Sequence, residues 1–235
     1  MSRQDENFQM SVELLQPWST FVMKTRLPLP IFNKMIAITD AIVDNAENEK
    51  SHGHNLAGQI KDELWIDPEI LERENLMVFF QDVVRNFIIQ QTSQQEPFEK
   101  ERIHAEEWYT QLLSMWVVSQ KDNEYNPCHF HSNCTISSVM YLKIPKYLPS
   151  RKPHRIEEDG AIIFTNNSGK DSVWGHPTMT LQPKVRDFFI FPASQQHFVY
   201  PFRTEDGKGE RRSVSFNAVF SSKTEQDQIK KGQND

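Results

Sequence analysis

Several features that mark other protein classes are scarce or absent in this sequence. It has only two cysteines, Cys128 and Cys134, in 235 residues, so a disulfide framework does not hold the fold together. No stretch approaches the roughly 20 apolar residues that a membrane helix needs. The start, MSRQDENFQM, lacks the basic and then apolar build of a secretory signal. We therefore expect a soluble, cytoplasmic protein without a membrane partner.

An excess of basic residues is also missing. The chain has 26 Lys and Arg against 32 Asp and Glu, a formal net charge of -6, and no basic cluster is flanked by stacking aromatic residues. Nucleic acid is therefore not expected as a partner. The hydrophobic fraction of 37% and the aromatic fraction of 11% are typical of a globular protein with a well-packed core.

Helical patterns precede strand patterns along the chain. Trp18–Leu27 has strand character, and apolar residues then recur at helical spacing from Ile31. Pro68 is placed to open a long helix that reaches about Gln90. After Trp108 the period changes from 3.6 to 2. Seven short strands are predicted there: Leu112–Ser119, Thr135–Ile144, Ala161–Thr165, Met179–Leu181, Asp187–Phe191, Phe198–Phe202 and Ser213–Phe220.

This order predicts a mainly β fold with flanking helices. It argues against the βαβ alternation of Rossmann and TIM folds, and short strands at this spacing indicate a sandwich or jelly roll. We expect a jelly-roll core with the N-terminal helices packed on one sheet. The length fits one domain, divided into an N-terminal strand and support helices (1–110), a β core (111–220) and a polar tail (221–235).

Two predicted strands have one apolar and one polar face. In Thr135–Ile144, Ser137 and Tyr141 alternate with apolar residues, and in the last strand Arg211, Ser213 and Ser215 alternate with Val214 and Phe216. An inward polar face is costly to bury unless it is paired or binds something. These strands are therefore expected to line a pocket.

The segment PCHFHSNC (127–134) contains the clearest candidate ligands. His129 and His131 are two residues apart, so both imidazoles project from one face of an extended chain. Imidazole is a common ligand of Fe(II), Zn and Cu. His197 is the best candidate for a third, distant ligand. Two near ligands and one distant one leave part of the metal open, as catalytic sites require.

A candidate anion site lies in the last predicted strand. Arg211 and Ser213 share a strand face, and a guanidinium fork beside a hydroxyl suits a carboxylate. Tyr141 could donate a further hydrogen bond. Because Arg211 follows His197 by fourteen residues (211 − 197 = 14), the two are expected on adjacent antiparallel strands. Arg212 is expected to be solvated.

Four segments in order resemble the 2-oxoglutarate/Fe(II)-dependent oxygenases, and most of all their prolyl-hydroxylase-like branch. They are Cys128–Pro145, Gly160–Phe164, Gln182–Pro192, and His197 with Arg211–Asn217. The earlier NLAGQI (55–60) is also reminiscent of that branch, and the resemblance covers Gln111 to Phe220.

The resemblance implies a double-stranded β-helix core, an Fe(II) cofactor, and 2-oxoglutarate and O₂ as cosubstrates. It matches His129 and His197 to metal ligands, and Arg211, Ser213 and Tyr141 to the group that binds the C5 carboxylate of 2-oxoglutarate. The implied activity is a dioxygenase, a hydroxylase of the prolyl-hydroxylase type, which couples decarboxylation of 2-oxoglutarate to C–H oxidation.

One position departs from the family pattern, because His131 stands where the family has Asp or Glu. Either His131 completes a three-histidine site, or Asn133, Asp122 or Glu124 supplies the ligand, or the position stays open as in halogenating relatives. Cys128 and Cys134 also suggest a structural zinc site, although their spacing crowds four ligands into one short segment.

Two other functions remain open at this stage. One is a cupin-like three-histidine metalloenzyme, such as a thiol dioxygenase, which would need no Arg211. The other is a non-catalytic jelly-roll binding module. The prime substrate, whether peptide, protein or small molecule, and the oligomeric state have no recognisable pattern in the sequence.

Overall fold

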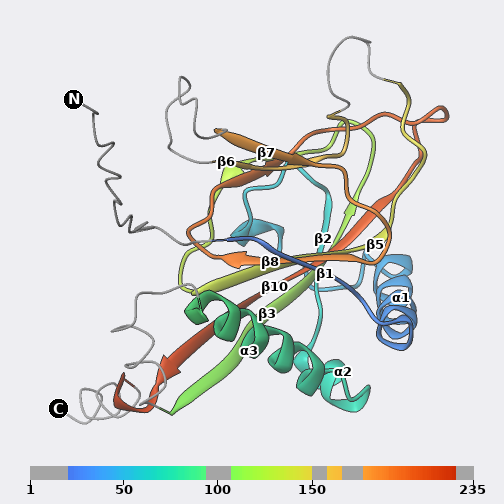
Figure 1. The fold of residues 1–235 in the computed structure, drawn as a ribbon. Coiled ribbons are helices and arrows are strands. Elements are labelled where there is room, and N and C mark those ends of the chain that lie inside the picture. Colours follow the sequence, from blue (N-terminus) through green and yellow to red (C-terminus); the bar gives the residue numbers. More distant parts are fainter. Residues whose placement is uncertain (1–20, 94–106, 150–157, 166–176, 226–235) are drawn as a thin grey trace, which may run out of the picture.

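The computed structural model describes residues 21–93, 107–149, 158–165 and 177–225. Two antiparallel sheets form its body (Figure 1). In chain order, the elements are β1 (Met23–Arg26), α1 (Leu29–Asp44), the short 3₁₀ helix η1 (Gly53–Asn55), β2 (Asp62–Trp65), α2 (Pro68–Arg73), α3 (Met77–Ser93), β3 (Trp108–Gln120), β4 (Asn126–His129), β5 (Ile136–Lys143), β6 (Ile162–Thr165), β7 (Thr178–Leu181), β8 (Asp187–Pro192), β9 (His197–Val199) and β10 (Arg211–Ser222).

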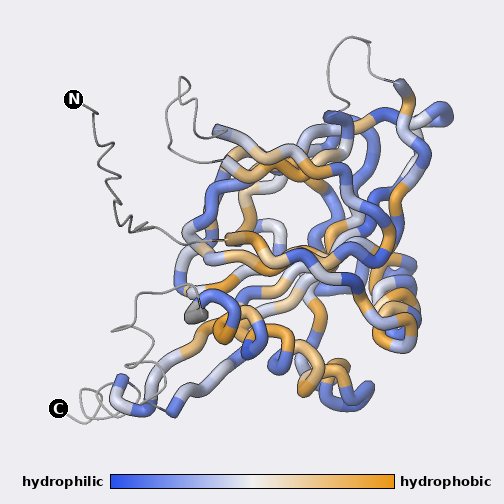
Figure 2. Tube along the Cα trace, in the orientation of Figure 1, coloured by the Kyte–Doolittle hydropathy of each residue, from blue (hydrophilic) through white to orange (hydrophobic). Residues whose placement is uncertain are grey.

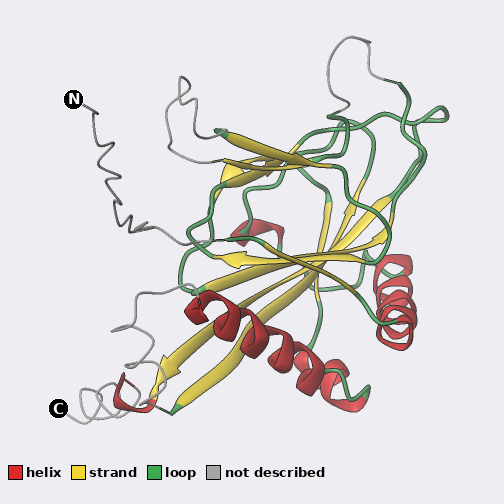
Figure 3. Cartoon of the chain, viewed as in Figure 1, coloured by secondary structure: helices red, strands yellow, loops and turns green. Residues whose placement is uncertain are grey.

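The larger sheet has the strand order β1-β8-β5-β10-β3-β2, and the smaller sheet has the order β4-β9-β6-β7. Figure 3 shows α2 and α3 on the side of the larger sheet that faces away from the smaller sheet. The mainly β, double-stranded β-helix architecture expected from the sequence, with helices on one sheet, is confirmed. β1 and β2, from the N-terminal third of the chain, extend the larger sheet at its two edges.

Alternating residues of the larger sheet serve two different cores. Val214 and Phe216 of β10 pack in the main core with Phe80 of α3, and the ring centroids of Phe80 and Phe216 are 5.7 Å apart. On the opposite face of the sheet, Val139 and Tyr141 of β5 join a second core between the sheets. Figure 2 shows hydrophobic residues along the strands of both sheets. The predicted apolar face under the helices is confirmed, and the predicted polar inward face is confirmed for β10, whose Arg211, Ser213 and Ser215 line a pocket. For β5 the inward face is largely apolar.

The prediction of one long helix from Pro68 to Gln90 is wrong. Two helices, α2 and α3, are separated at Asn75, whose φ of 56° lies in the left-handed region. The amide of Asn75 donates to the Glu72 carbonyl, and the amide of Leu76 donates to the Leu71 carbonyl. This pair of bonds is the Schellman arrangement that ends helices, and Asn tolerates the left-handed conformation better than most residues. The buried side chains of Leu71 and Leu76 complete it.

Two expectations about the arginine strand are also wrong. His197 and Arg211 do not lie on adjacent strands, because β9 pairs with β4 and β6 while β10 pairs with β3 and β5. The segment between them crosses from the smaller sheet to the larger one. Arg212 is not solvated: its side chain is buried and forms ion pairs with Asp40 and Glu210. A buried guanidinium requires such partners.

Some boundaries differ from the expected ones. β1 begins at Met23, and residues 18–20 of the expected strand lie outside the described residues. β2 was not expected at all, and β10 continues to Ser222, into the segment expected as a polar tail. The first ten residues, His104, His154, Trp174 and the tail from residue 226 onward also lie outside the described part of the chain. Within the described residues, no helix has the length and apolar character needed to cross a membrane.

Candidate active site

Two of the three candidate histidines face each other across a strand pair of the smaller sheet. His129 ends β4 and His197 begins β9, and the two residues are direct partners in the antiparallel register. Directly opposed residues bring their side chains close together on one face. His131 follows β4, and its amide donates to the Ala193 carbonyl at 2.9 Å, which fixes the segment after β4 against the end of β8.

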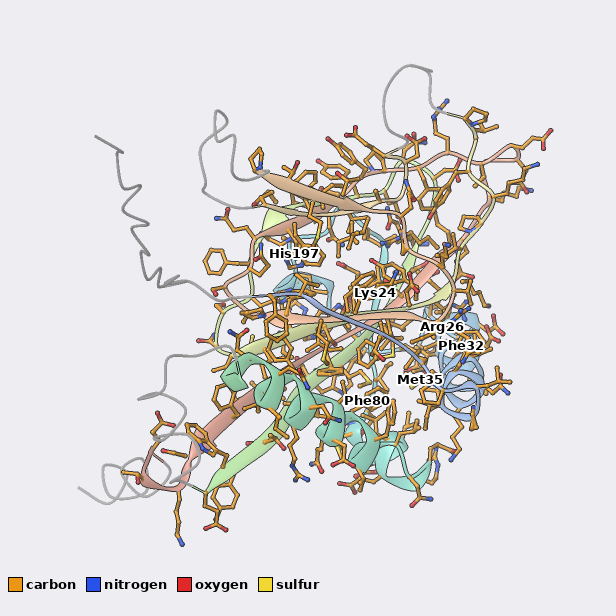
Figure 4. All side chains as sticks on the ribbon, viewed as in Figure 1. Lys24, Arg26, Phe32, Met35, Phe80 and His197 are labelled. Atoms are coloured by element: carbon orange, nitrogen blue, oxygen red, sulfur yellow. The ribbon has the colours of Figure 1, made fainter. Side chains whose placement is uncertain are left out.

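The three imidazoles converge. The ring centroids of His129 and His197 are 4.3 Å apart, and the ring of His131 lies 5.3 Å from each of them. One nitrogen from each ring can be chosen so that all three lie within 4.8 Å of one another. Figure 4 shows His197 on the opposite side of the larger sheet from Phe80, in the space between the sheets. The arrangement is compact enough for one metal ion.

Backbone carbonyls orient two of these rings. His129 Nδ1 lies 2.7 Å from the Pro127 oxygen, and His197 Nδ1 lies 2.9 Å from the Gln195 oxygen. Because a carbonyl can only accept, each Nδ1 carries the proton, and each Nε2 keeps its lone pair for a metal. This is the usual second contact of a metal-binding histidine.

Burial keeps the three rings uncharged. Together with a smaller effect of the neighbouring His129, it lowers the pKa of His197 to about 3 and that of His131 to about 4. Burial also lowers the pKa of His129, against the opposing effect of its hydrogen bond to Pro127. Neutral imidazole is the form that binds metals, so these histidines need lose no proton near neutral pH to become ligands.

The other proposed ligands have different partners or positions. Asp122 accepts two hydrogen bonds of 2.7 Å from Thr204, and Glu124 accepts from the amides of Lys61 and Lys121. Cys128 is exposed, and both cysteines are free thiols. Among the described residues, only the three histidines form a compact group of possible metal ligands. The donor set therefore has three neutral nitrogens and no carboxylate, and imidazole nitrogen suits Fe(II).

Arg211 lines the same pocket as the histidines, from the opposite sheet. It is 1% exposed. Its two terminal nitrogens donate to Gln120 Oε1 at 2.9 Å and to the Tyr141 hydroxyl at 3.1 Å, and the guanidinium carbon lies 4.7 Å from the centre of the Tyr141 ring. Nε of Arg211 has no hydrogen-bond partner. A buried guanidinium that has a spare donor, and no carboxylate partner in the described part of the chain, suits an incoming anion.

Ser213 and Tyr141 stand beside this guanidinium. They are register partners on β10 and β5, and Ser213 lines the pocket. Complete burial raises the pKa of Tyr141 to about 12 against the opposing effect of Arg211, so the phenol remains a hydrogen-bond donor. The structure thus brings all six residues singled out from the sequence to one region, in a cluster of three histidines and a cluster around Arg211.

Three further polar residues, one that lines this pocket and two that adjoin Arg211, were not recognised from the sequence. Gln120 holds Arg211 as described, and the partly buried side chain of Tyr147 lies close enough to Arg211 for the guanidinium to oppose the rise in the pKa of the phenol. Glu63 lines the same pocket as the three histidines and Leu56. The available signal for Glu63 was its alternation with Leu64 in the segment DELW, since alternate residues of a strand face opposite sides. That segment was not recognised as a strand.

Comparison with known families gives a match on this same region. Residues 114–217 match the family described as "Putative 2OG-Fe(II) oxygenase". The matched range runs from β3 into β10 and contains the three histidines, Tyr141, Arg211 and Ser213. No curated protein sequence matches the chain.

Solved structures share the fold at low sequence identity. A prolyl-4-hydroxylase from Pseudomonas putida superposes with a TM-score of 0.50 at 16% identity, over 85% of this chain and 93% of that one. The non-heme alpha-ketoglutarate-dependent epimerase SnoN from nogalamycin biosynthesis gives a TM-score of 0.54 at 13% identity, over 86% of this chain and 78% of that one. The double-stranded β-helix of this chain, its convergent histidines and the family match over β3 to β10 agree, and this region of the chain, residues 114–217, belongs to the 2-oxoglutarate- and Fe(II)-dependent oxygenases.

Proposed function

We propose that this oxygenase is a hydroxylase of the prolyl-hydroxylase type, in which His129, His131 and His197 bind Fe(II). The observation that carries the assignment is the convergence of three neutral imidazoles whose donor atoms lie within 4.8 Å of one another. Three protein ligands leave further coordination positions free for the cosubstrates. Because His131 replaces the usual carboxylate, the protein contributes no negative charge to the metal.

We assign the C5 carboxylate of 2-oxoglutarate to Arg211, with Ser213 and Tyr141. The unpartnered Nε of Arg211 and its burial support this assignment, because an anion would supply the missing acceptor. Gln120 and Tyr141 hold the guanidinium in place. The buried hydroxyl of Tyr147 also lies close to Arg211, whose charge opposes the rise in the pKa of Tyr147 that burial causes.

When bound, Fe(II), 2-oxoglutarate and O₂ supply the oxidising chemistry, in which decarboxylation of the keto acid is coupled to oxidation of a C–H bond. The chain's own residues bind, orient and shield. Hydrogen bonds to Pro127 and Gln195 fix two imidazole rings. Trp116 and Phe191 line the pocket beside the histidines, and such walls limit the access of water to the reacting centre.

The remaining assignments extend this proposal. We infer that the chain forms one domain, since both sheet edges are completed by N-terminal strands, and that the protein acts in the cytoplasm, in line with its two free thiols. The cosubstrate is a small molecule. The prime substrate is either a peptide or protein, as for the prolyl hydroxylases, or a small molecule.

Succinate formation from 2-oxoglutarate and the weak visible band of anaerobic Fe(II)–2-oxoglutarate test the proposal. The wild type should show both, His197→Ala should show neither, and Arg211→Ala should show both only at much higher 2-oxoglutarate concentration. His54→Ala, which removes an exposed histidine outside the cluster, is the matched control. Equal succinate formation in the wild type and His197→Ala would refute the metal assignment, and an unaltered 2-oxoglutarate requirement in Arg211→Ala would favour a three-histidine enzyme that does not use this cosubstrate.

A further inference from the structure

Glu63 is a buried carboxylate in the active-site pocket that the chemistry described so far does not use. It lies on β2, where its register partner is Val118 of β3, and both residues line the pocket. The next residue, Leu64, belongs to the main core on the other face of the sheet. The strand therefore directs Glu63 inward, toward the space that His129 and His131 share.

One oxygen of the Glu63 carboxylate lacks a partner among the described residues. The residue is 2% exposed, and its Oε2 atom has no hydrogen-bond donor. Within the described ranges, no lysine or arginine forms an ion pair with it. Burial and, to a smaller extent, the carboxylate of Glu124 raise the pKa of Glu63 to about 7. A buried acid without a donor or a countercharge is costly, and such groups recur at binding sites.

The surroundings of Glu63 favour a ligand over an intramolecular partner. A Cβ atom on Gly58 would lie 2.5 Å from Glu63 Oε1 and 2.6 Å from Asn126 Oδ1, so two oxygen acceptors approach the same backbone position. The segment that carries Gly58 is tied down nearby, because the amide of Gln59 donates to the Tyr125 carbonyl and that of Lys61 to Glu124. This segment is thus fixed beside the two acceptors, which line the pocket together.

The charge of the site selects the kind of ligand. The three histidines are neutral, since burial lowers the pKa of each, and none of them compensates Glu63. Glu63 is also not part of the compact histidine cluster, so it is not a fourth ligand of a metal held there. A neutral donor would form a hydrogen bond with Glu63 but would not neutralise its charge, whereas a cationic nitrogen would do both.

We propose that Glu63, beside Asn126, binds a protonated amine or guanidinium of the prime substrate, so that the enzyme acts on cationic substrates. This inference rests on the proposed function, because it places the substrate next to the three histidines. Glu63 is a specificity-determining residue in this proposal: it recognises a nitrogen cation and holds the neighbouring carbon chain near the metal position.

Calorimetric titration of the anaerobic Fe(II)–2-oxoglutarate protein with matched small molecules tests the proposal. L-Lysine and L-arginine are compared with their neutral counterparts L-norleucine and L-citrulline. The wild type should bind the cationic member of each pair at least about tenfold more tightly, as expected for a charge-assisted hydrogen bond. Glu63→Gln, which keeps the shape and removes the charge, should lose this preference.

Asp62→Asn is the control, because Asp62 precedes Glu63 on β2 and is only half-buried. It removes the same charge from the neighbouring position and should keep the preference. Equal binding of charged and neutral probes, failure of both cationic probes to bind, or a preference that survives in Glu63→Gln would each overturn the proposal.

The visible band of Fe(II)–2-oxoglutarate, measured on the same samples, separates this inference from the proposed function. If the band forms in the wild type and in Glu63→Gln but no charge preference exists, the inference alone fails. If the wild type shows no band, the proposed function fails, and the same titrations on metal-free protein then decide whether Glu63 binds cations.

Discussion

Replacing Glu63 with Gln should change how the stability of the protein depends on pH. Burial and Glu124 raise the pKa of Glu63 from 4.5 to about 7. Between these two values the folded protein holds a proton that the unfolded chain has released, so folding stability falls as the pH rises through this window. Glutamine carries no such proton, and the variant should escape this loss.

The size of the effect follows from the two pKa values. For one group shifted from 4.5 to about 7, the free energy of unfolding drops by about 2.5 kcal/mol between pH 5 and pH 8. This is a large part of the 5–15 kcal/mol that is typical of a whole domain. Any constant cost of burying the glutamine amide cancels when the two pH values are compared.

Urea denaturation of the metal-free protein at pH 5 and pH 8 measures this difference. The free energy of unfolding of Glu63→Gln, relative to the wild type, should increase by about 2.5 kcal/mol from the lower to the higher pH. Asp62→Asn serves as the control for the loss of a carboxylate from the same strand. If the difference in free energy of unfolding between Glu63→Gln and the wild type changes by less than about 1 kcal/mol from pH 5 to pH 8, Glu63 titrates as a solvated acid and is not desolvated in the pocket.

Three further substitutions test other parts of the structure. Arg211→Lys should weaken 2-oxoglutarate binding about 100-fold, or about 3 kcal/mol, because an ammonium cannot make the two-pronged contact of a guanidinium with a carboxylate. Titration of the visible band with 2-oxoglutarate measures the affinity, and an unchanged affinity would contradict the carboxylate assignment. Arg212→Met should lower the free energy of unfolding by about 3 kcal/mol, since Asp40 and Glu210 lose their buried partner. Urea denaturation measures this loss, and an unchanged free energy of unfolding would show that the ion pairs do not stabilise the fold. Asn75→Val should cost about 1–2 kcal/mol at its positive φ while Asn75→Gly should not, and equal losses in both would argue against the left-handed turn.

Features that depend on neighbouring residues could be predicted from the sequence. The alternation in β10 placed Arg211 and Ser213 on the inward face, and the two-residue spacing of His129 and His131 put them on one side of the chain. The restriction to a sandwich or a jelly roll followed from the change of period after Trp108. Each of these inferences needs only the geometry of a single strand.

Features that depend on distant residues could not be predicted. Arg212 is buried because Asp40, which lies 172 residues earlier, reaches it from α1, and no local pattern records that contact. His197 and Arg211 are close in sequence yet lie on different sheets, because the segment between β9 and β10 crosses from the smaller sheet to the larger one. Glu63 is a site residue only because β2 pairs with β3, and β2 has just four residues.

The pairing of His129 with His197 links metal content to the integrity of the smaller sheet. β4 and β9 have only four and three residues, so few backbone bonds join them. An ion shared by these two side chains would act as a clamp between the strands, much as a disulfide joins two segments. Iron loss would then loosen one wall of the barrel, and amide hydrogen exchange in β4 and β9 would report iron occupancy even when no substrate is turned over.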